Sequence, residues 1–190
     1  MRKVVAGLVS LAGAVALTIG FIASGLAETP QFEYVGVSKC KMCHKSEKSG
    51  AQFTLWENSK HAKAFEALAS PKSMEIAKAK GIEDPQKSES CLKCHATAAM
   101  VPAEKRAAGV VLEDGVTCEA CHGPGSEYKK NSVMKAIYNG EEKGETYGLL
   151  MPTVETCTRC HNEESPTWDK SKPFDFKAMS EKIAHPVPKT

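Results

Sequence analysis

Residues 115–125 read GVTCEACHGPG and contain the pattern Cys-x-x-Cys-His. The pattern occurs four times and uses all eight cysteines of the chain. Motifs 1 to 4 comprise, in order, Cys40, Cys43 and His44; Cys91, Cys94 and His95; Cys118, Cys121 and His122; and Cys157, Cys160 and His161. This spacing is typical of c-type haem attachment, because two thiols bond the vinyl groups of one haem while the adjacent imidazole reaches its iron. The sequence therefore predicts four covalently attached haem c groups, with the motif histidines as proximal iron ligands.

Other uses of paired cysteines explain this pattern less well. Eight cysteines in an exported chain could form disulfides, and Cys-x-x-Cys units occur in zinc sites and in thioredoxin-like redox pairs. None of these requires a histidine directly after every second cysteine. Haem attachment accounts for all four triplets and leaves no cysteine over.

The composition limits how large a core the polypeptide can build by itself. Aromatic residues make up only 6% of the chain, and lysine and glutamate are frequent. Such a chain buries little apolar surface of its own. Four haem rings can supply the missing apolar mass, so we expect a mainly α fold with much irregular loop, wrapped around the haems as one domain over residues 28–190.

The first 27 residues have the order of a secretory signal peptide. Arg2 and Lys3 precede an apolar run over residues 4–22, and small residues follow at 25–27. The apolar run is also long enough for an uncleaved membrane anchor. Because c-type haem is attached outside the cytoplasm, both readings place the protein in the periplasm or outside the cell.

The charge balance argues against a nucleic-acid partner. The formal charge of +2 includes Arg2 and Lys3, and the remaining chain carries 23 basic and 23 acidic residues. Haem propionates would make the loaded protein acidic overall. A basic nucleic-acid surface is not indicated, although clusters of lysine can still dock redox partner proteins locally.

Apolar periodicity and turn residues predict the following elements. Helices are expected over residues 49–70, ending at Pro71; 72–80, ending at Gly81; 96–108, broken at Pro102; and 126–138, ending at residues 139–140. Residues 109–116 could form a short hairpin, and residues 123–125 are expected to make a tight turn.

The histidine count leaves iron ligands missing. Four six-coordinate bis-histidine haems would need eight histidines, and the chain has six. Once the proximal four are assigned, only His61 and His185 are available as distal ligands. The other two irons could take Met, Tyr or Lys, a histidine from a neighbouring molecule, or no protein ligand.

Three stretches resemble the tetrahaem cytochrome c-554 family and its multihaem relatives. They are residues 34–36 with 56–62 around motif 1, residues 115–127 around motif 3, and the tail over residues 174–186. The resemblance implies closely stacked haems in a mainly helical fold. It also implies that His61 binds the haem of motif 3, that His185 binds the haem of motif 4, and that the haem of motif 2 has an open distal face.

Tyr128 stands where the family often has a histidine that ligates the first haem. It could ligate ferric iron as phenolate, hydrogen-bond a bound water, or pack in the interior. A histidine from another molecule could also complete this haem, as in relatives that polymerise into haem filaments.

These features favour an electron carrier between a donor enzyme or quinol dehydrogenase and a downstream acceptor. The ligand deficit also allows a redox enzyme that acts on nitrogen oxides or hydroxylamine at an open haem. A third alternative is a self-associating subunit of an extracellular haem filament.

Overall fold

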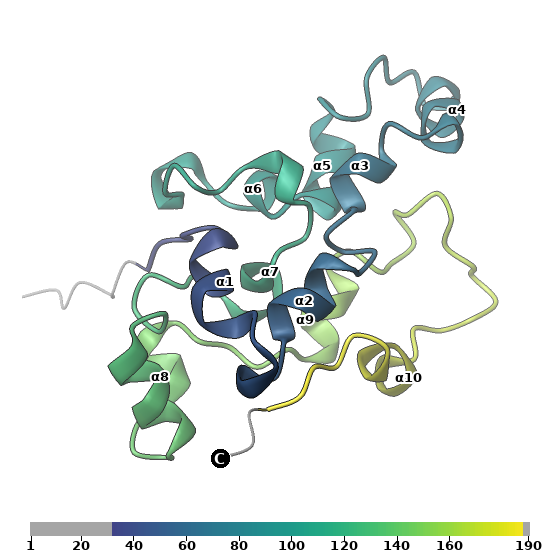
Figure 1. Cartoon of the computed structure of the whole chain (residues 1–190). Helices are drawn as coiled ribbons and strands as arrows, with labels where there is room; N and C mark the ends of the chain where they lie inside the picture. The colour runs from purple at the N-terminus through teal and green to yellow at the C-terminus, as the bar shows by residue number, and fades with distance from the viewer. Residues whose placement is uncertain (1–31, 188–190) are drawn as a thin grey trace, which may run out of the picture.

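The computed structural model describes residues 32–187, so the predicted signal peptide lies outside the described residues. Within this range, short helices are joined by long irregular segments, and the one β-bridge pairs Tyr34 with Arg106 (Figure 1). The α-helices are α1 (Ser38–His44), α2 (Gln52–Glu57), α3 (Ala64–Ala67), α4 (Pro71–Ala79), α5 (Glu89–His95), α6 (Thr97–Met100), α7 (Cys118–His122), α8 (Asn131–Tyr138), α9 (Val154–Thr158) and α10 (Phe176–Glu181). The 3-10 helices are η1 (Glu47–Ser49), η2 (Ala103–Lys105), η3 (Leu112–Asp114) and η4 (Gly144–Tyr147). The predicted fold class is confirmed.

The helices are brief even by the standards of small domains. The longest one in residues 32–187, α4, has nine residues. No helix in this range has both the length and the apolar character that crossing a bilayer requires.

Each cysteine motif lies at a helix end. Helices α1, α5 and α7 all finish on the motif histidine, while α9 finishes within motif 4, just before Cys160 and His161. Residues three and four apart lie on one face of a helix. A single helical turn therefore presents both thiols and the imidazole of a motif to the same side.

The single helix predicted over residues 49–70 is wrong, because tertiary hydrogen bonds interrupt it. The chain forms α2 and α3 with turns between them. The indole N–H of Trp56 donates to the Val116 carbonyl at 2.8 Å. The Val116 N–H in turn donates to the His61 carbonyl at 2.9 Å. The Ala64 N–H also donates to that carbonyl, at 3.1 Å, so the turn between α2 and α3 is joined at His61 to the segment that leads into motif 3.

Two further predictions agree with the structure. The helix expected over residues 72–80 is α4, whose Ser70 cap accepts a hydrogen bond from the Ser73 N–H and whose first position is Pro71. The expected break at Pro102 separates α6 from η2. In both places a local signal, a serine cap or a proline, decides the outcome.

Two other predictions are wrong. The segment 109–116 contains the 3-10 helix η3 in place of a hairpin. The helix expected from residue 126 begins only at Asn131, because residues 126–129 form a turn that buries Tyr128. Tertiary packing overrides the local pattern in both segments.

The protein core is small, as the composition predicted. One cluster joins Leu68, Leu92 and Ala96, with Phe65 and Leu112 packed against it. Next to it, the Thr117 N–H donates to the Thr97 hydroxyl at 2.7 Å. This cluster ties α3, α5, α6 and η3 together but does not extend to α8 or α10.

A buried carboxylate joins the start of the described chain to motif 3. Glu119 lies between the two cysteines of α7 and is 1% exposed. Its two oxygens accept hydrogen bonds from the backbone N–H groups of Val35 (2.9 and 3.1 Å), Gly36 (2.9 Å) and Gly125 (2.7 Å). Donors surround both oxygens, an arrangement that satisfies an ionised carboxylate. Glu119 therefore fixes the segment before α1 against the turn after α7.

We expect Glu119→Gln to destabilise the loaded protein by about 2–4 kcal/mol, because the amide NH2 would face backbone donors and leave them unpaired. Chemical denaturation, followed by far-ultraviolet circular dichroism, measures this change. The matched control is Glu104→Gln, an exposed residue, which should shift stability by less than about 0.5 kcal/mol. Equal effects of the two substitutions would contradict the structural role of Glu119.

Candidate haem-binding sites

Three of the four motif histidines have one ring nitrogen hydrogen-bonded to the protein. Their Nδ1 atoms lie 3.2 Å from Gln52 Oε1 for His44, 2.7 Å from the Ala64 carbonyl oxygen for His95, and 3.1 Å from the Leu150 carbonyl oxygen for His122. All three partners are acceptors, so the proton belongs on Nδ1 and the lone pair on Nε2. This is the usual way in which a second hydrogen bond orients a metal-ligating imidazole.

The fourth motif histidine is held by ring packing. The His161 ring stacks on Phe174 at a centroid distance of 5.5 Å and an interplanar angle of 22°. Phe174 lies in the segment before α10, so the C-terminal part of the chain orients motif 4.

Two pairs of imidazole rings lie opposite each other, at interplanar angles of 64° and 51°, with a separation that suits an iron atom between them. The centroids of His61 and His161 are 6.1 Å apart, and those of His122 and His185 are 5.8 Å apart. An iron atom held by one nitrogen of each ring would separate the ring centres by roughly 6 Å. Both candidate distal histidines thus lie opposite a motif histidine, and these residues fit bis-histidine haem.

The partners differ from those that the family resemblance implied. His61 faces motif 4 and His185 faces motif 3, the reverse of the expectation. The break between α2 and α3 carries His61 toward His161. The tail after α10 brings His185 to His122. This C-terminal segment passes close to α2 (Figure 1).

Burial keeps the paired imidazoles neutral. It lowers the pKa of His61 and His185, and the neighbouring His161 and His122, respectively, lower them further. Burial also lowers the pKa of His122 and of His161. Neutral imidazole is the form that binds iron, so the environment of both pairs favours ligation.

His44 and His95 have no facing imidazole within residues 32–187. His44 is nevertheless connected to the pair at motif 3. Gln52 accepts from its ring, and the Gln52 amide donates to the Pro186 carbonyl at 2.9 Å, one residue beyond His185. Gln52 therefore orients the motif 1 histidine and anchors the tail that carries the distal histidine of motif 3.

Tyr128 packs in the interior and does not face a motif histidine. Its side chain is 8% exposed, and its hydroxyl donates to the Gly123 carbonyl at 2.8 Å. Burial raises the pKa of the phenol, and the charge of Glu119 raises it further. Of the three alternatives for Tyr128, these contacts support packing over phenolate ligation of the first haem: the protonated hydroxyl braces the turn after motif 3.

Contacts between the motif segments show which motifs are neighbours in space. Glu119 of motif 3 accepts hydrogen bonds from Val35 and Gly36, shortly before motif 1. Arg159 of motif 4 donates to the Ala120 carbonyl of motif 3 at 2.7 Å, and Lys93 of motif 2 forms an ion pair with Glu164, three residues after motif 4. The motifs therefore adjoin one another in the order 1, 3, 4, 2, which differs from their order in the sequence.

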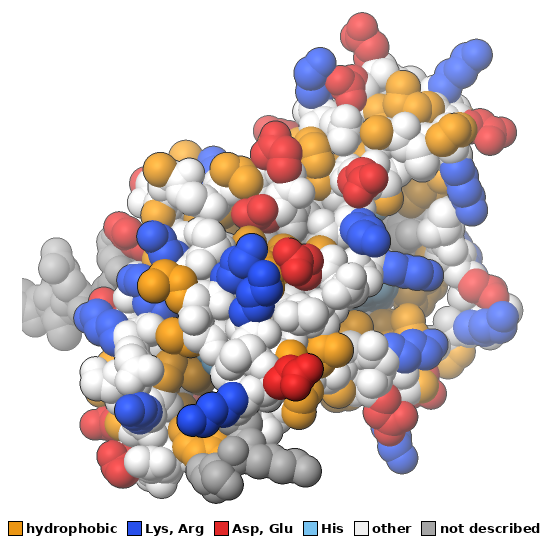
Figure 2. Space-filling view, in the orientation of Figure 1, with side chains coloured by type: hydrophobic (Ala, Val, Ile, Leu, Met, Phe, Trp, Pro, Cys, Tyr) orange, Lys and Arg blue, Asp and Glu red, His pale blue; other side chains and the backbone are white. Residues whose placement is uncertain are grey.

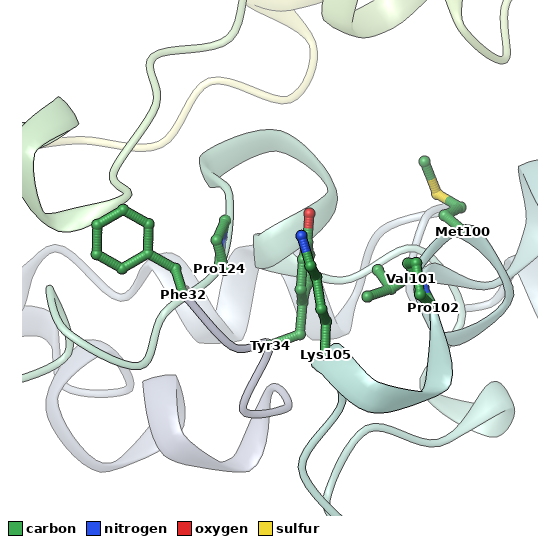
Figure 3. Close-up of a pocket in the computed structure, with 7 residues that line it drawn as sticks. All are labelled: Phe32, Tyr34, Met100, Val101, Pro102, Lys105 and Pro124. Carbon is green, nitrogen blue, oxygen red and sulfur yellow. The ribbon is translucent and has the colours of Figure 1, made fainter. Parts of the chain in front are cut away.

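Two surface cavities lie away from these histidines. One, of about 290 Å³, is lined by Phe32, Tyr34, Met100, Val101, Pro102, Lys105 and Pro124. Figure 3 shows the side chains of Tyr34 and Lys105 among those that line it. Another, of about 740 Å³, lies against α5 and α6. Neither is lined by a motif cysteine or histidine, so the haem-binding residues lie on the helix faces outside these cavities.

Sequence reasoning missed several residues that shape these sites. Gln52, Glu119 and the carbonyl acceptors of Ala64 and Leu150 act on partners that are distant in the sequence. Nothing in their local sequence distinguishes them from ordinary polar or backbone groups. Only the adjacency of Glu119 to Cys118 offered a signal.

Known proteins share both the sequence and the fold. Residues 39–123 match the family described as cytochrome c554 and c-prime. Cytochrome c-554 of Nitrosomonas europaea is 30% identical over 182 residues, an alignment that covers 84% of this chain and 71% of the relative. The solved reduced state of cytochrome c554 from the same organism superimposes with a TM-score of 0.55 at 24% identity, over 80% of this chain and 83% of that one. With its Cys-x-x-Cys-His motifs and facing imidazoles, the chain belongs to the cytochrome c-554 family of c-type cytochromes, which bind haem c covalently.

Proposed function

We propose that the chain carries four haem c groups, one on each motif, and works as an electron carrier between redox partner proteins in the periplasm or outside the cell. The observation that carries this proposal is the continuous adjacency of the motifs in the order 1, 3, 4, 2, which hydrogen bonds and an ion pair between their segments establish. Bound haem iron supplies one-electron chemistry by cycling between its ferric and ferrous states. The polypeptide positions the haems and tunes their reduction potentials.

Each ligand has a distinct task in this proposal. His44, His95, His122 and His161 are the proximal ligands, each on the helical turn that holds its two cysteines. His61 and His185 would be the second protein ligands at motifs 4 and 3. Two imidazoles held by the protein would leave no open position at either haem, and this suits electron transfer.

A second candidate function is a reaction of a small nitrogen compound, such as a nitrogen oxide or hydroxylamine, at an open haem. The specific support is that His44 and His95 face no imidazole within the described residues. Electron transfer does not need an open position on the haem iron. Binding of a small molecule at motifs 1 and 2 therefore distinguishes the enzymatic function from the electron-carrier function.

The haem content tests the proposal directly. We expect the mature protein to have a mass equal to the polypeptide plus four haems, with reversible uptake of four electrons in a spectroelectrochemical titration. Cys157→Ser combined with Cys160→Ser should remove one haem and one electron. A lower wild-type haem count, or haems that do not cycle reversibly, would contradict the carrier function.

Substitution of the distal histidines tests the corrected pairing. His61→Ala and His185→Ala should each convert one low-spin ferric haem to high spin, as measured by electron paramagnetic resonance. In a chain that lacks the motif 4 haem through Cys157→Ser and Cys160→Ser, His61→Ala should have no further effect, whereas His185→Ala should still convert a haem. The opposite dependence would restore the pairing that the family resemblance implied.

Carbon monoxide measures the number of open irons. We expect the fully reduced protein to bind about two equivalents, at the haems of motifs 1 and 2, because among the motif histidines of residues 32–187 only His44 and His95 lack an imidazole opposite them. Binding of none would mean that both irons have another ligand. Sedimentation velocity would then show whether a second copy supplies a histidine, as a self-associating filament subunit requires.

A further inference from the structure

A basic surface covers the outside of α1 and the turn that follows it. We call it the α1 lysine surface and define it by Lys39, Lys41, Lys45 and Lys48 together with Met42. All five side chains are exposed. Figure 2 shows basic side chains gathered over the α1 part of the visible face. Residues 39–48 carry four lysines against the single acid Glu47, although residues 28–190 as a whole are formally neutral.

These lysines are not neutralised by the protein itself. None of the four forms an ion pair with another residue in the range 32–187, whereas Lys87, Lys93, Lys130, Lys170 and Lys172 all do. The ammonium of Lys41 lies 5.0 Å from the centre of the Phe53 ring. This cation–π contact holds one charge in place on the surface. The positive charge is therefore available to a partner.

The centre of the surface is apolar. Met42 is 83% exposed, the largest exposed fraction among the large apolar side chains of the described chain. Methionine adapts its shape to different contact surfaces and is enriched at interfaces. An apolar centre with a basic rim is the composition of a transient docking site for an acidic protein.

The surface also lies next to one end of the proposed electron path. Cys40, Cys43 and His44 belong to the same seven-residue helix as Lys39, Lys41 and Met42. A protein bound over α1 would thus approach the haem of motif 1. That motif adjoins motif 3 through the hydrogen bonds of Glu119 to Val35 and Gly36, and it stands at the start of the order 1, 3, 4, 2.

We propose that the α1 lysine surface docks an acidic electron-transfer protein, which exchanges electrons with this chain at the haem of motif 1. In the reducing direction, one electron leaves the partner's reduced cofactor and converts ferric iron at motif 1 to ferrous iron. The partner is oxidised by one electron, and no proton or bond is transferred. The inference rests on the proposed electron-carrier function and adds the entry point and the chemical class of the partner.

Helix α4 provides a matched control surface. It also carries exposed lysines, Lys72 and Lys78, and an exposed apolar side chain, Met74. However, it contains no motif residue and lies at the periphery, far from α1 (Figure 1). The two surfaces thus have similar composition and differ in their distance from motif 1.

The test compares two charge-reversed proteins with the wild-type holoprotein. Lys39→Glu with Lys45→Glu alters the α1 lysine surface and leaves the Lys41–Phe53 contact intact. Lys72→Glu with Lys78→Glu makes the same change in net charge on α4. The probe is a reduced flavodoxin, an acidic one-electron carrier, and stopped-flow absorbance records the rate of haem reduction at several ionic strengths.

We expect the α1 variant to react at least about tenfold more slowly than wild type at low ionic strength and to lose most of the salt dependence, while the α4 variant stays within about twofold. Equal effects of both variants would overturn the docking site, because net charge alone would then explain the rates.

Vesicles of anionic phospholipid test whether the α1 lysine surface binds a membrane in place of a protein. Loss of vesicle binding in the α1 variant with an unchanged flavodoxin rate would assign the surface to a membrane and overturn the proposal. If all variants still hold four haems that cycle reversibly, the carrier function stands whatever the docking result.

Discussion

Two cysteine thiols and one imidazole must lie on the same side of a single helical turn wherever haem c is attached, and the other features of this protein follow from that constraint. In an α-helix, residues three and four positions apart lie on the same side, whereas in an extended strand they do not all do so. Helices α1, α5 and α7 each end with their motif histidine. Short helices joined by loops can then turn each motif toward its neighbours, which a few long helices could not do.

The facing imidazoles explain why the loops run where they do. His61 reaches motif 4 only because hydrogen bonds from the segment before motif 3 interrupt the helix between α2 and α3. His185 reaches motif 3 because Gln52 holds the tail at Pro186. Both pairs join parts of the chain that are far apart in sequence. They supply long-range order that the small cluster around Leu68 and Leu92 cannot provide.

Charge has two different roles in the inside and on the outside of the molecule. Inside, the Glu119 carboxylate is fully hydrogen-bonded and holds residues 35–36, directly before α1, so it fixes motif 1 relative to motif 3. Outside, the lysines of α1 have no acidic partner within the described chain. Helix α1 is thus fixed at its N-terminal end by Glu119, while its outer face is free to bind a partner protein. This combination suits a protein that must orient its cofactor and still exchange partners.

The sequence by itself determined everything that depends on local spacing. The four Cys-x-x-Cys-His motifs, the mainly α class, helix α4 with its Ser70 cap, and the break at Pro102 all follow from residues within a few positions of one another. His61 and His185 could also be selected as distal candidates by counting histidines. Only the tertiary structure decided which motif each one faces, that Tyr128 packs, and that Glu119 binds backbone 84 residues away. The physical reason is that a hydrogen bond or a shared metal between distant segments depends on how every intervening turn is packed, and no local pattern records it.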